Sequence, residues 1–487
     1  MTRFIGLDLG TSSLKAILID ASQRILAEHS VALNVQRAHD GWSEQDASDW
    51  EIAAVEALSA LASKADCSTL AGIGLSGHMH GATLVGADDR PLRACMLWND
   101  TRSHAEAKEF DTKPQFRAIS GNIVFPGFTA PKVEWVRRNE PELFAKISKI
   151  LLPKDYLRLF LTGEYASEMS DAAGTSWLDT GKRDWSDELL SACHLNRAQM
   201  PRLVEGSEAS GQLRPALAEK LGLPVVPVAG GAGDNAAAGI GAGVIEDGQA
   251  FLSLGTSGVL FAANDAYRAD PETAVHSFCH ALPARWHQMG VILAATDALE
   301  WLSRLTGQSA AALTADLGEL QAPSRSLFLP YLGGERTPHN DASIRGQFLD
   351  LDHVTDAKEA ARAVLEGVSF AFADCNDALA ATGTNIRSAL ALGGGSRSAY
   401  WLDALATVLG FPLELPHDGE FGAALGAARL GMLAASDVAV SEVVTKPPVA
   451  RVFEPNMQFR DDFKQGHARY RAAYHAIKTL DHEDTTP

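Results

Sequence analysis

A twelve-residue stretch occurs twice in this chain, as LDLGTSSLKAIL at residues 7–18 and as LSLGTSGVLFAA at residues 252–263. Both copies place Leu-Gly-Thr-Ser between two runs of strand-forming residues, which predicts a β-hairpin with a small, hydroxyl-rich turn. Such a turn can hold phosphate oxygens through its N–H groups and hydroxyls, because glycine lets the backbone approach a ligand closely. Two such hairpins predict a nucleotide bound between two duplicated halves. The expected phosphate-binding residues are Gly10, Thr11, Ser12, Gly255, Thr256 and Ser257.

Two further pairs of segments repeat in the same order. Residues 73–77 and 391–395 each run from an apolar strand into glycine. Residues 233–241 and 419–426 each follow a short apolar run and open an alanine-rich helix. Three matched pairs in one order favour an ancient duplication, although glycine- and alanine-rich turns look alike in many α/β proteins.

The chain length of 487 residues is too great for one core and suits two α/β domains. We place the boundary close to Ile245, which gives an N-terminal domain of residues 1–245 and a C-terminal domain of residues 246–487. Strands alternate with helices, and this order predicts sheets that are covered on both faces. No low-complexity linker separates the halves, so we expect them to pack together and to move as a hinge around a cleft.

The net charge of −19 disfavours nucleic acid and anionic membranes as partners, since both require a basic surface. The five cysteines are scattered and contain no CxxC pair, which indicates reduced thiols and a cytoplasmic protein. The sequence opens directly on a strand and has no apolar run long enough to cross a bilayer, so we expect neither a secretory signal nor a membrane span.

Two acidic residues are candidate catalytic groups. Asp8 lies inside an apolar strand directly before the first predicted phosphate turn, where a carboxylate is costly unless a cation or donors satisfy it. Mg²⁺ bound to nucleotide phosphates would do so, directly or through water. The alternative is a turn or capping residue.

Asp234 follows Gly-Gly-Ala-Gly and opens a predicted helix, a position typical of an N-cap. The bare glycine segment leaves room for a substrate, so this carboxylate could also accept the proton of an attacking hydroxyl. Its ordinary pKa of ~3.9 makes it a weak base. In a loose phosphoryl-transfer transition state, orienting the hydroxyl matters more than basicity.

Several other polar segments carry weaker signals. Met79 and His80 suit polyol recognition, because histidine offers a donor and an acceptor while methionine packs on a carbon skeleton. The run Gly393–Ser398, with Gly394 and Gly395 at its centre, lies between a strand and a helix where a purine nucleoside could rest on the backbone. The GxGxxG string at residues 72–77 lacks the βαβ context of a dinucleotide fold. The histidines around His276 are expected to pack rather than to bind metal.

Taken together, these motifs resemble the FGGY carbohydrate kinases, which have the duplicated actin/hexokinase-like, ribonuclease H-like ATPase fold. The resemblance extends from Phe4 to about Leu430. Its most specific blocks are residues 79–84, 97–100, 126–132, 152–158, 170–175, 275–283 and 334–340.

This resemblance implies ATP-dependent phosphorylation of D-xylulose to D-xylulose 5-phosphate. Carried over by position, Asp234 is the proton acceptor and Asp8 an acid needed for activity, both able to hold Mg²⁺. Met79 and His80 contact the sugar, and Asn235 lies beside the sugar hydroxyls. His78 stands where bacterial members of this kind commonly have Gln.

Other functions stay open at this stage. A D-ribulose, glycerol or gluconate kinase is the nearest alternative, and a non-catalytic actin-like filament protein or sugar sensor is a more distant one. We expect sugar and ATP as partners, and a homodimer is compatible with the sequence.

Overall fold

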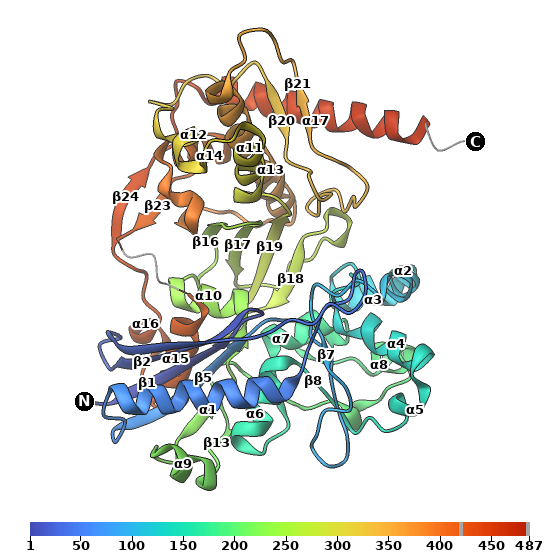
Figure 1. Ribbon diagram of the computed structural model, residues 1–487, viewed down its shortest axis with the longest axis vertical. Coiled ribbons are helices and arrows are strands. Elements are labelled where there is room, and N and C mark those ends of the chain that lie inside the picture. Colours follow the sequence, from blue (N-terminus) through green and yellow to red (C-terminus); the bar gives the residue numbers. More distant parts are fainter. Residues whose placement is uncertain (418–421, 484–487) are drawn as a thin grey trace.

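A computed structural model describes residues 1–417 and 422–483, with side chains described up to residue 480. Residues 418–421, which include the start of the second helix-opening repeat, lie outside the described residues. The chain forms two lobes, one mostly from its N-terminal half and one from its C-terminal half (Figure 1).

The N-terminal lobe is built around one seven-stranded sheet with the order β13-β14-β5-β1-β2-β3, to which β15 adds beside β5. Strands β1, β5 and β14 are mutually parallel, whereas β2 and β13 run antiparallel to their neighbours. The strands are β1 (Arg3–Leu9), β2 (Ser13–Asp20), β3 (Ile25–Ala32), β5 (Leu70–Gly77), β13 (Ala209–Gln212), β14 (Pro227–Ala229) and β15 (Ala232–Gly233).

The C-terminal lobe repeats this arrangement in the order β18-β19-β17-β16-β22-β23-β24. Strand β16 corresponds to β1, since each pairs antiparallel with the next strand of its hairpin and parallel with a later strand. The two edge strands come from different places in the chain order. Strand β13 comes before its partner β14, whereas β24 comes after its partner β23. The strands are β16 (Gln249–Leu254), β17 (Gly258–Asn264), β18 (His276–Cys279), β19 (Trp286–Ile292), β22 (Ser388–Leu392), β23 (Leu413–Pro416) and β24 (Val449–Phe453). The matching strand order confirms the predicted duplicated α/β fold.

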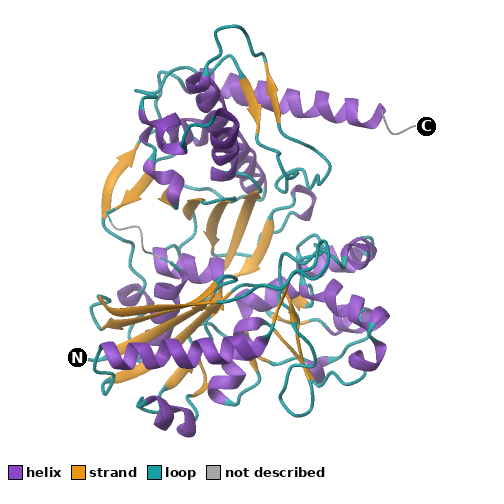
Figure 2. Ribbon diagram, in the orientation of Figure 1, coloured by secondary structure: helices purple, strands orange, loops and turns teal. Residues whose placement is uncertain are grey.

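Helices pack on the sheet of each lobe, and Figure 2 shows the long helix α1 lying across the strands of the N-terminal lobe. The apolar face of α1 buries Trp50, Leu58 and Leu61 in one core with strands β1, β2 and β5. In the C-terminal lobe α13 and α14 pack on the sheet, and α17 packs on both of them. The main helices are α1 (Ala47–Lys64), α4 (Thr129–Asn139), α6 (Pro153–Thr162), α10 (Asp234–Ala242), α11 (Thr296–Thr306), α13 (Ala357–Ala381), α14 (Ala399–Leu409), α15 (Ala423–Ala434) and α17 (Arg460–Glu483).

Shorter elements complete both lobes. The shorter helices are α2 (His104–Asp111), α3 (Pro114–Ser120), α5 (Pro141–Phe144), α7 (Met169–Ala172), α8 (Asp187–Ala192), α9 (Pro215–Leu221), α12 (Ala310–Ala315) and α16 (Val440–Val443). The 3₁₀ turns of the described residues are η1 (Ala173–Thr175), η2 (Arg197–Gln199), η3 (Pro271–Thr273) and η4 (Gly394–Arg397). Small two-stranded pairs are formed by β4 (Glu44–Gln45), β6 (Thr83–Val85), β7 (Cys95–Met96), β8 (Lys149–Leu151), β9 (Ala166–Glu168), β10 (Leu178–Asp179), β11 (Asp184–Trp185), β12 (Arg202–Val204), β20 (Leu327–Leu329) and β21 (Gln347–Leu349).

Helix α15 crosses from the C-terminal half of the sequence into the N-terminal lobe (Figure 1). It packs on β1 and β5 on one side and on α10 on the other. This close approach depends on glycines: a Cβ added to Gly74 would lie 1.7 Å from the carbonyl oxygen of Ala427. A Cβ added to Gly426 would lie 1.8 Å from the carbonyl oxygen of Ala237. The domain boundary at Ile245 stays a prediction. Because α15 lies after that boundary in the sequence and packs on β1 and β5, one boundary does not divide the chain into two independently packed lobes.

The GxGxxG string of residues 72–77 lies within strand β5 rather than in a strand-to-helix turn, as its lack of βαβ context suggested. All five cysteines are buried and unpaired. Within residues 1–417 and 422–483 no helix is both long enough and apolar enough to cross a bilayer.

Candidate active site

Both predicted hairpins are present, with their turns at residues 10–12 and 255–257. In the first turn the N–H of Gly10 donates to the carbonyl oxygen of Ser13 (3.0 Å), whereas the N–H groups of Thr11 and Ser12 donate to no other described group. The Thr11 hydroxyl accepts a hydrogen bond from the Trp98 indole (3.0 Å). The first turn therefore keeps two backbone donors available for a ligand.

The two candidate acids, Asp8 and Asp234, are neighbours at one edge of the N-terminal sheet. Asp8 on β1 is in register with Ser76 on β5, and Ser76 is in register with Ala232, two residues before Asp234. Burial raises the pKa of Asp8, while the Ser76 hydroxyl and the Lys15 charge oppose that rise. Burial and then the charge of Asp8 raise the pKa of Asp234 to about 6.

Asp234 is the first residue of α10, and Gly233 occupies the N-cap position without a side-chain cap. The interpretation of Asp234 as a typical N-cap is therefore wrong. Its carboxylate instead accepts hydrogen bonds from the N–H (2.7 Å) and the side-chain amide (3.0 Å) of Asn235. Both bonds use one carboxylate oxygen, Oδ1, so Oδ2 is left for a substrate.

A network of buried charges lies beneath the glycine segment that carries Asp234. The Ser170 hydroxyl accepts from the N–H of Gly233 (3.1 Å), and Ser170 is itself held by Glu168. The Arg158 guanidinium donates to the carbonyl oxygens of Ala229 (2.6 Å) and Gly230 (2.5 Å). These bonds hold both ends of the segment that carries the catalytic candidate.

The network has more acids than bases. Lys154 lies 2.6 Å from Asp155 and 3.3 Å from Asp171, and all of these side chains are fully buried together with Glu168 and Arg158. Burial raises the pKa of Asp171 well above its usual range and also raises that of Glu168, while the charge of Lys154 opposes both shifts. Residues 152–158 and 170–175 belong to the family-like blocks of the sequence, but their joint support of Asp234 is not visible there, because these residues meet only in the folded chain.

Met79 and His80 lie beside the glycine segment of residues 230–233 that precedes Asp234. A Cβ on Gly233 would come within 2.8 Å of the Met79 side chain. The Nδ1 of His80 lies 2.7 Å from the carbonyl oxygen of Gly174, which can only accept, so Nδ1 carries the proton. Burial lowers the pKa of His80 to about 3. His80 is therefore neutral, with Nε2 as an acceptor for a ligand hydroxyl.

His78 points elsewhere, because its buried ring packs edge-on against Trp50 at 5.9 Å. Neither ring nitrogen of His78 has a hydrogen-bond partner among the described residues. His276, His280 and His287 are buried among phenylalanines, as expected for packing histidines: His276 lies 5.3 Å from Phe125 and His287 lies 4.6 Å from Phe261.

A groove of about 780 Å³ lies in the C-terminal lobe between α11, α12 and the start of α14. Gly394 and Gly395 line it, as expected for the predicted nucleoside surface. A Cβ on Gly394 would meet nothing within 4 Å, whereas one on Gly395 would lie 2.8 Å from the Leu254 side chain. The groove adjoins the second hairpin, because the Thr296 hydroxyl on its wall donates to the carbonyl oxygen of Gly255 (2.8 Å).

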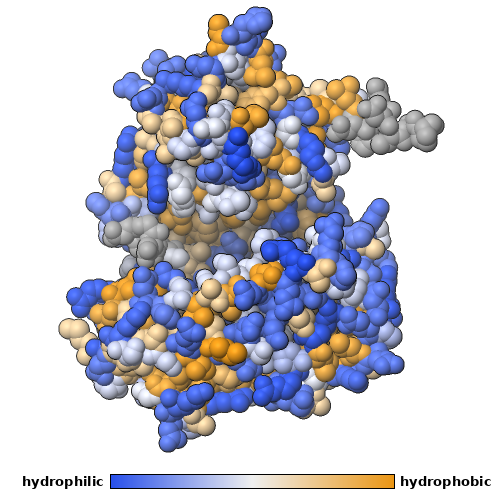
Figure 3. All heavy atoms as spheres, viewed as in Figure 1, coloured by the Kyte–Doolittle hydropathy of each residue, from blue (hydrophilic) through white to orange (hydrophobic). Residues whose placement is uncertain are grey.

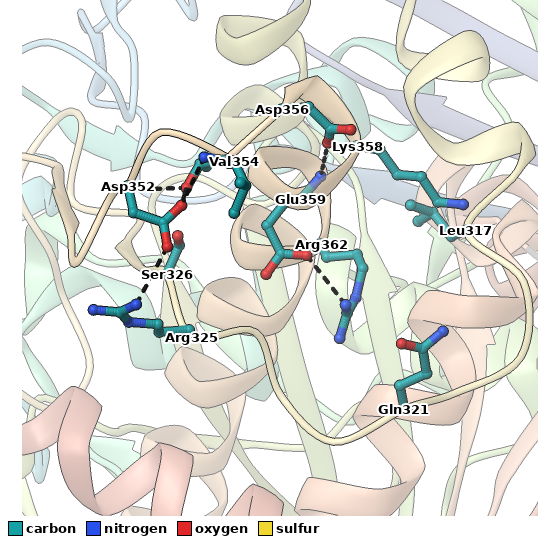
Figure 4. A pocket seen from close by; sticks show the side chains of 11 residues that line it. Leu317, Gln321, Arg325, Ser326, Asp352, Val354, Asp356, Lys358, Glu359 and Arg362 are labelled. Atoms are coloured by element: carbon teal, nitrogen blue, oxygen red, sulfur yellow. Dashed lines mark hydrogen bonds and ion pairs between the residues drawn. The ribbon is translucent and has the colours of Figure 1, made fainter.

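A second groove of about 500 Å³ contains none of the predicted site residues (Figure 4). Its charged side chains pair with one another, Arg325 with Asp352 (3.2 Å) and Arg362 with Glu359 (3.1 Å). In contrast, a deep hollow separates the two lobes on the face shown in Figure 3. Neither Asp8 nor Asp234 lines the groove of Figure 4.

Two lobes with the same strand order, each carrying a glycine-threonine-serine hairpin, define a duplicated ATPase-type kinase fold. The model of the FGGY family of carbohydrate kinases, N-terminal domain, matches residues 3–241, and that of the C-terminal domain matches residues 250–435. The chain belongs to the FGGY family of carbohydrate kinases. It is a sugar kinase, and the alternative of a non-catalytic filament or sensor protein is set aside.

Several individual relatives are named for xylulose. The chain is 47% identical to the xylulose kinase of Escherichia coli K12, over 98% of this chain and 99% of the relative. The crystal structure of a "xyloylose kinase" from Brucella ovis superposes with a TM-score of 0.96 at 57% identity, covering 98% of this chain and all of that one. Xylulose kinase from Rhodospirillum rubrum superposes with a TM-score of 0.92 at 27% identity, covering 99% and 100%.

Proposed function

We propose that this protein transfers the γ-phosphoryl group of ATP to the 5-hydroxyl of D-xylulose, forming D-xylulose 5-phosphate and ADP. The observation that carries the proposal is the position of Asp234, which adjoins both Asp8 and the Met79–His80 segment. Near-full-length similarity to kinases named for xylulose supports the choice of sugar.

Asp234 aligns the attacking hydroxyl and accepts its proton. A pKa of about 6 makes it a better base at neutral pH than an ordinary carboxylate while leaving it ionised. The bonds from Asn235 hold one oxygen, and the buried support from Ser170 and Arg158 fixes the segment that carries the acid. This fixed geometry orients the hydroxyl toward the phosphate.

ATP is held by the two hairpins and by the groove along Gly394 and Gly395. The free N–H groups of Thr11 and Ser12 donate to phosphate oxygens, with Gly255, Thr256 and Ser257 in the equivalent place on the other lobe. The nucleoside lies in the C-terminal groove, where the missing side chain of Gly394 leaves space.

The residues present fit a magnesium ion. The Oδ1 of Asp8 is buried and has no hydrogen-bond partner among the described residues, and a second carboxylate, Asp234, lies close enough to repel it. Carboxylate oxygens are the ligands that Mg²⁺ prefers, bound directly or through water. When bound, Mg²⁺ neutralises charge that develops on the phosphates.

The sugar lies against Met79, His80 and Asn235. The Met79 side chain packs on the carbon skeleton, and the unprotonated Nε2 of His80 accepts from a sugar hydroxyl. The Asn235 amide donates to Asp234 and leaves its own carbonyl oxygen for the substrate.

The pH dependence of catalysis follows from the raised pKa of Asp234. We expect kcat/KM to fall about tenfold per pH unit below pH 6, because the base must be deprotonated to accept a proton. A pH–rate profile at low sugar concentration measures this. An acid limb that begins only near pH 4, at the ordinary carboxyl pKa, contradicts the assignment.

The choice of sugar is tested by coupled ADP release on D-xylulose, D-ribulose, glycerol and D-gluconate. We expect kcat/KM to be highest for D-xylulose, by at least about tenfold. Higher turnover on D-ribulose would contradict the assignment of D-xylulose as the substrate but not the assignment of the protein as a sugar kinase. ADP release that does not depend on sugar would contradict the proposal as a whole.

The five reduced, buried thiols support action in the cytoplasm. The homodimer, and the absence of nucleic acid and membrane partners, stay predictions from the sequence.

A further inference from the structure

Arg336 is a cation of the C-terminal half that reaches the N-terminal lobe. It lies in the segment after β20, and its guanidinium sits 4.7 Å from the ring centre of Phe125, which precedes α4. The guanidinium forms no hydrogen bond or ion pair with any residue that the structure describes. A guanidinium has five N–H donors and no acceptor, so these donors require a partner from outside the chain or from water.

A wall of aromatic rings connects Arg336 to the candidate sugar site. Phe125 packs edge-on against Phe128 at 5.5 Å, and Phe128 stacks on His80 at 4.4 Å. His276 on β18 closes the wall, at 5.3 Å from Phe125 and 5.9 Å from Phe128. Arg336 and His80 therefore lie along the same wall, one from each lobe.

The local charge of Arg336 is not cancelled by its neighbour. Glu335 accepts hydrogen bonds from the N–H groups of Leu293 (3.0 Å) and Arg336 (2.8 Å) rather than from the guanidinium. Burial raises the pKa of Glu335 to about 8, so this acid is mostly neutral at pH 7. The positive charge is thus available to a ligand.

The two ends of the site have different electrostatics. At one end the charge of Asp8, together with burial, raises the pKa of Asp234, and this is the end where phosphate is transferred. At the other end the charges of Lys132 and Arg336 act on His80 and, with burial, lower its pKa. A sugar that attacks the γ-phosphate through its 5-hydroxyl points its C1–C2 end away from the two acids, toward His80 and Arg336.

We propose that Arg336 is a specificity residue of the sugar site, donating hydrogen bonds from the C-terminal lobe to the carbonyl end of a bound ketose. This inference rests on the proposed function and adds to it the part of the sugar that the protein recognises, which is the carbonyl end. A carbonyl oxygen only accepts, so it matches a donor-only guanidinium, whereas the neutral His80 serves the hydroxyls. Because Arg336 belongs to the C-terminal lobe and His80 to the N-terminal lobe, a ketose held in this way contacts both lobes.

The test replaces Arg336 by methionine, which keeps the length of the side chain and removes its donors. We expect KM for D-xylulose to rise about 10- to 100-fold, the loss typical of a hydrogen bond to a charged group. The KM for xylitol, in which the C2 carbonyl is reduced to a hydroxyl, should rise less. The preference of the variant for ketose over alditol should therefore fall. The Kd for ATP, measured by titration calorimetry, reports an intact nucleotide site.

Arg345→Met is the matched control, because Arg345 lies in the same segment, is exposed, and bonds only to the carbonyl oxygens of neighbouring residues. It should leave KM and sugar preference unchanged. A KM within about twofold of wild type in Arg336→Met, or equal losses for D-xylulose and xylitol, overturns the proposal.

If Arg336→Met fails to fold, the same comparison of sugars is made with Arg336→Lys, since lysine keeps the charge and loses the planar pair of donors. Reduced ketose preference in that variant supports the proposal, and unchanged preference overturns it. A wild-type protein inactive on D-xylulose but active on another ketose would refute the proposed sugar only. The Arg336 comparison would then use that ketose and its alditol.

Discussion

Replacing Asp234 by asparagine is expected to lower kcat by at least about 100-fold while the protein stays folded. Asparagine has nearly the same shape but cannot accept the proton of the attacking hydroxyl.

The raised pKa of Asp234 also predicts the sign of the effect of this substitution on stability. A carboxyl whose pKa is higher in the folded state than in the unfolded state stabilises the protein at low pH, and this contribution is lost as pH rises through about 6. At pH 7.5 Asp234→Asn should therefore unfold at a temperature no lower than wild type.

Coupled-assay turnover and thermal unfolding measure the two effects of Asp234→Asn. Asp187→Asn is the control, since Asp187 also lies in the first turn of a helix, α8, and is an exposed partner of Arg197. Turnover in Asp234→Asn within tenfold of wild type would remove the base assignment. Loss of turnover together with a lower unfolding temperature at pH 7.5 would indicate a structural role instead.

Replacing Gly74 by alanine is expected to destabilise the protein by more than about 3 kcal/mol or to prevent folding. The added Cβ would lie 1.7 Å from the carbonyl oxygen of Ala427 and 2.9 Å from the backbone N of Gly431. These neighbours are backbone atoms of α15, so they cannot move aside as a flexible side chain can. The helix would have to leave β5, and the contact between the two halves would open.

The urea unfolding midpoint of Gly74→Ala measures this loss. Gly333→Ala is the matched control, because a Cβ there would meet nothing within 4 Å and the residue is exposed. An unfolding midpoint for Gly74→Ala equal to that of Gly333→Ala would show that α15 does not pack as closely as described.

Local sequence patterns predicted the secondary structure near the site well. The two hairpins and the apolar strand of residues 73–77, which lies in β5, are present as expected, because period-two patterns and small turn residues are local signals. The prediction for Asp234 was less accurate. Its place at the start of a helix was right, but the N-cap is Gly233, since the choice between two adjacent residues depends on backbone angles that a sequence does not display.

The support beneath Asp234 could not be predicted in the same way. Lys154 and Arg158 on α6 meet Glu168 and Ser170 only after two segments have folded together. A run containing Lys, Asp and Arg on a helix is typical of a solvated face, whereas here these side chains are fully buried. Only the packing of α6 against the sheet reverses that expectation.

The sequence by itself determined the duplicated α/β design, the two hairpins and the identity of the candidate acids, because repeats and turn residues are written in contiguous segments. The tertiary structure alone decided that α15 covers the sheet of the other half and that Asp8 and Asp234 interact. It also decided that Arg336 faces the aromatic wall beside His80. These relations join residues that are distant in the chain, and their energies depend on burial and distance, which exist only once the chain has folded.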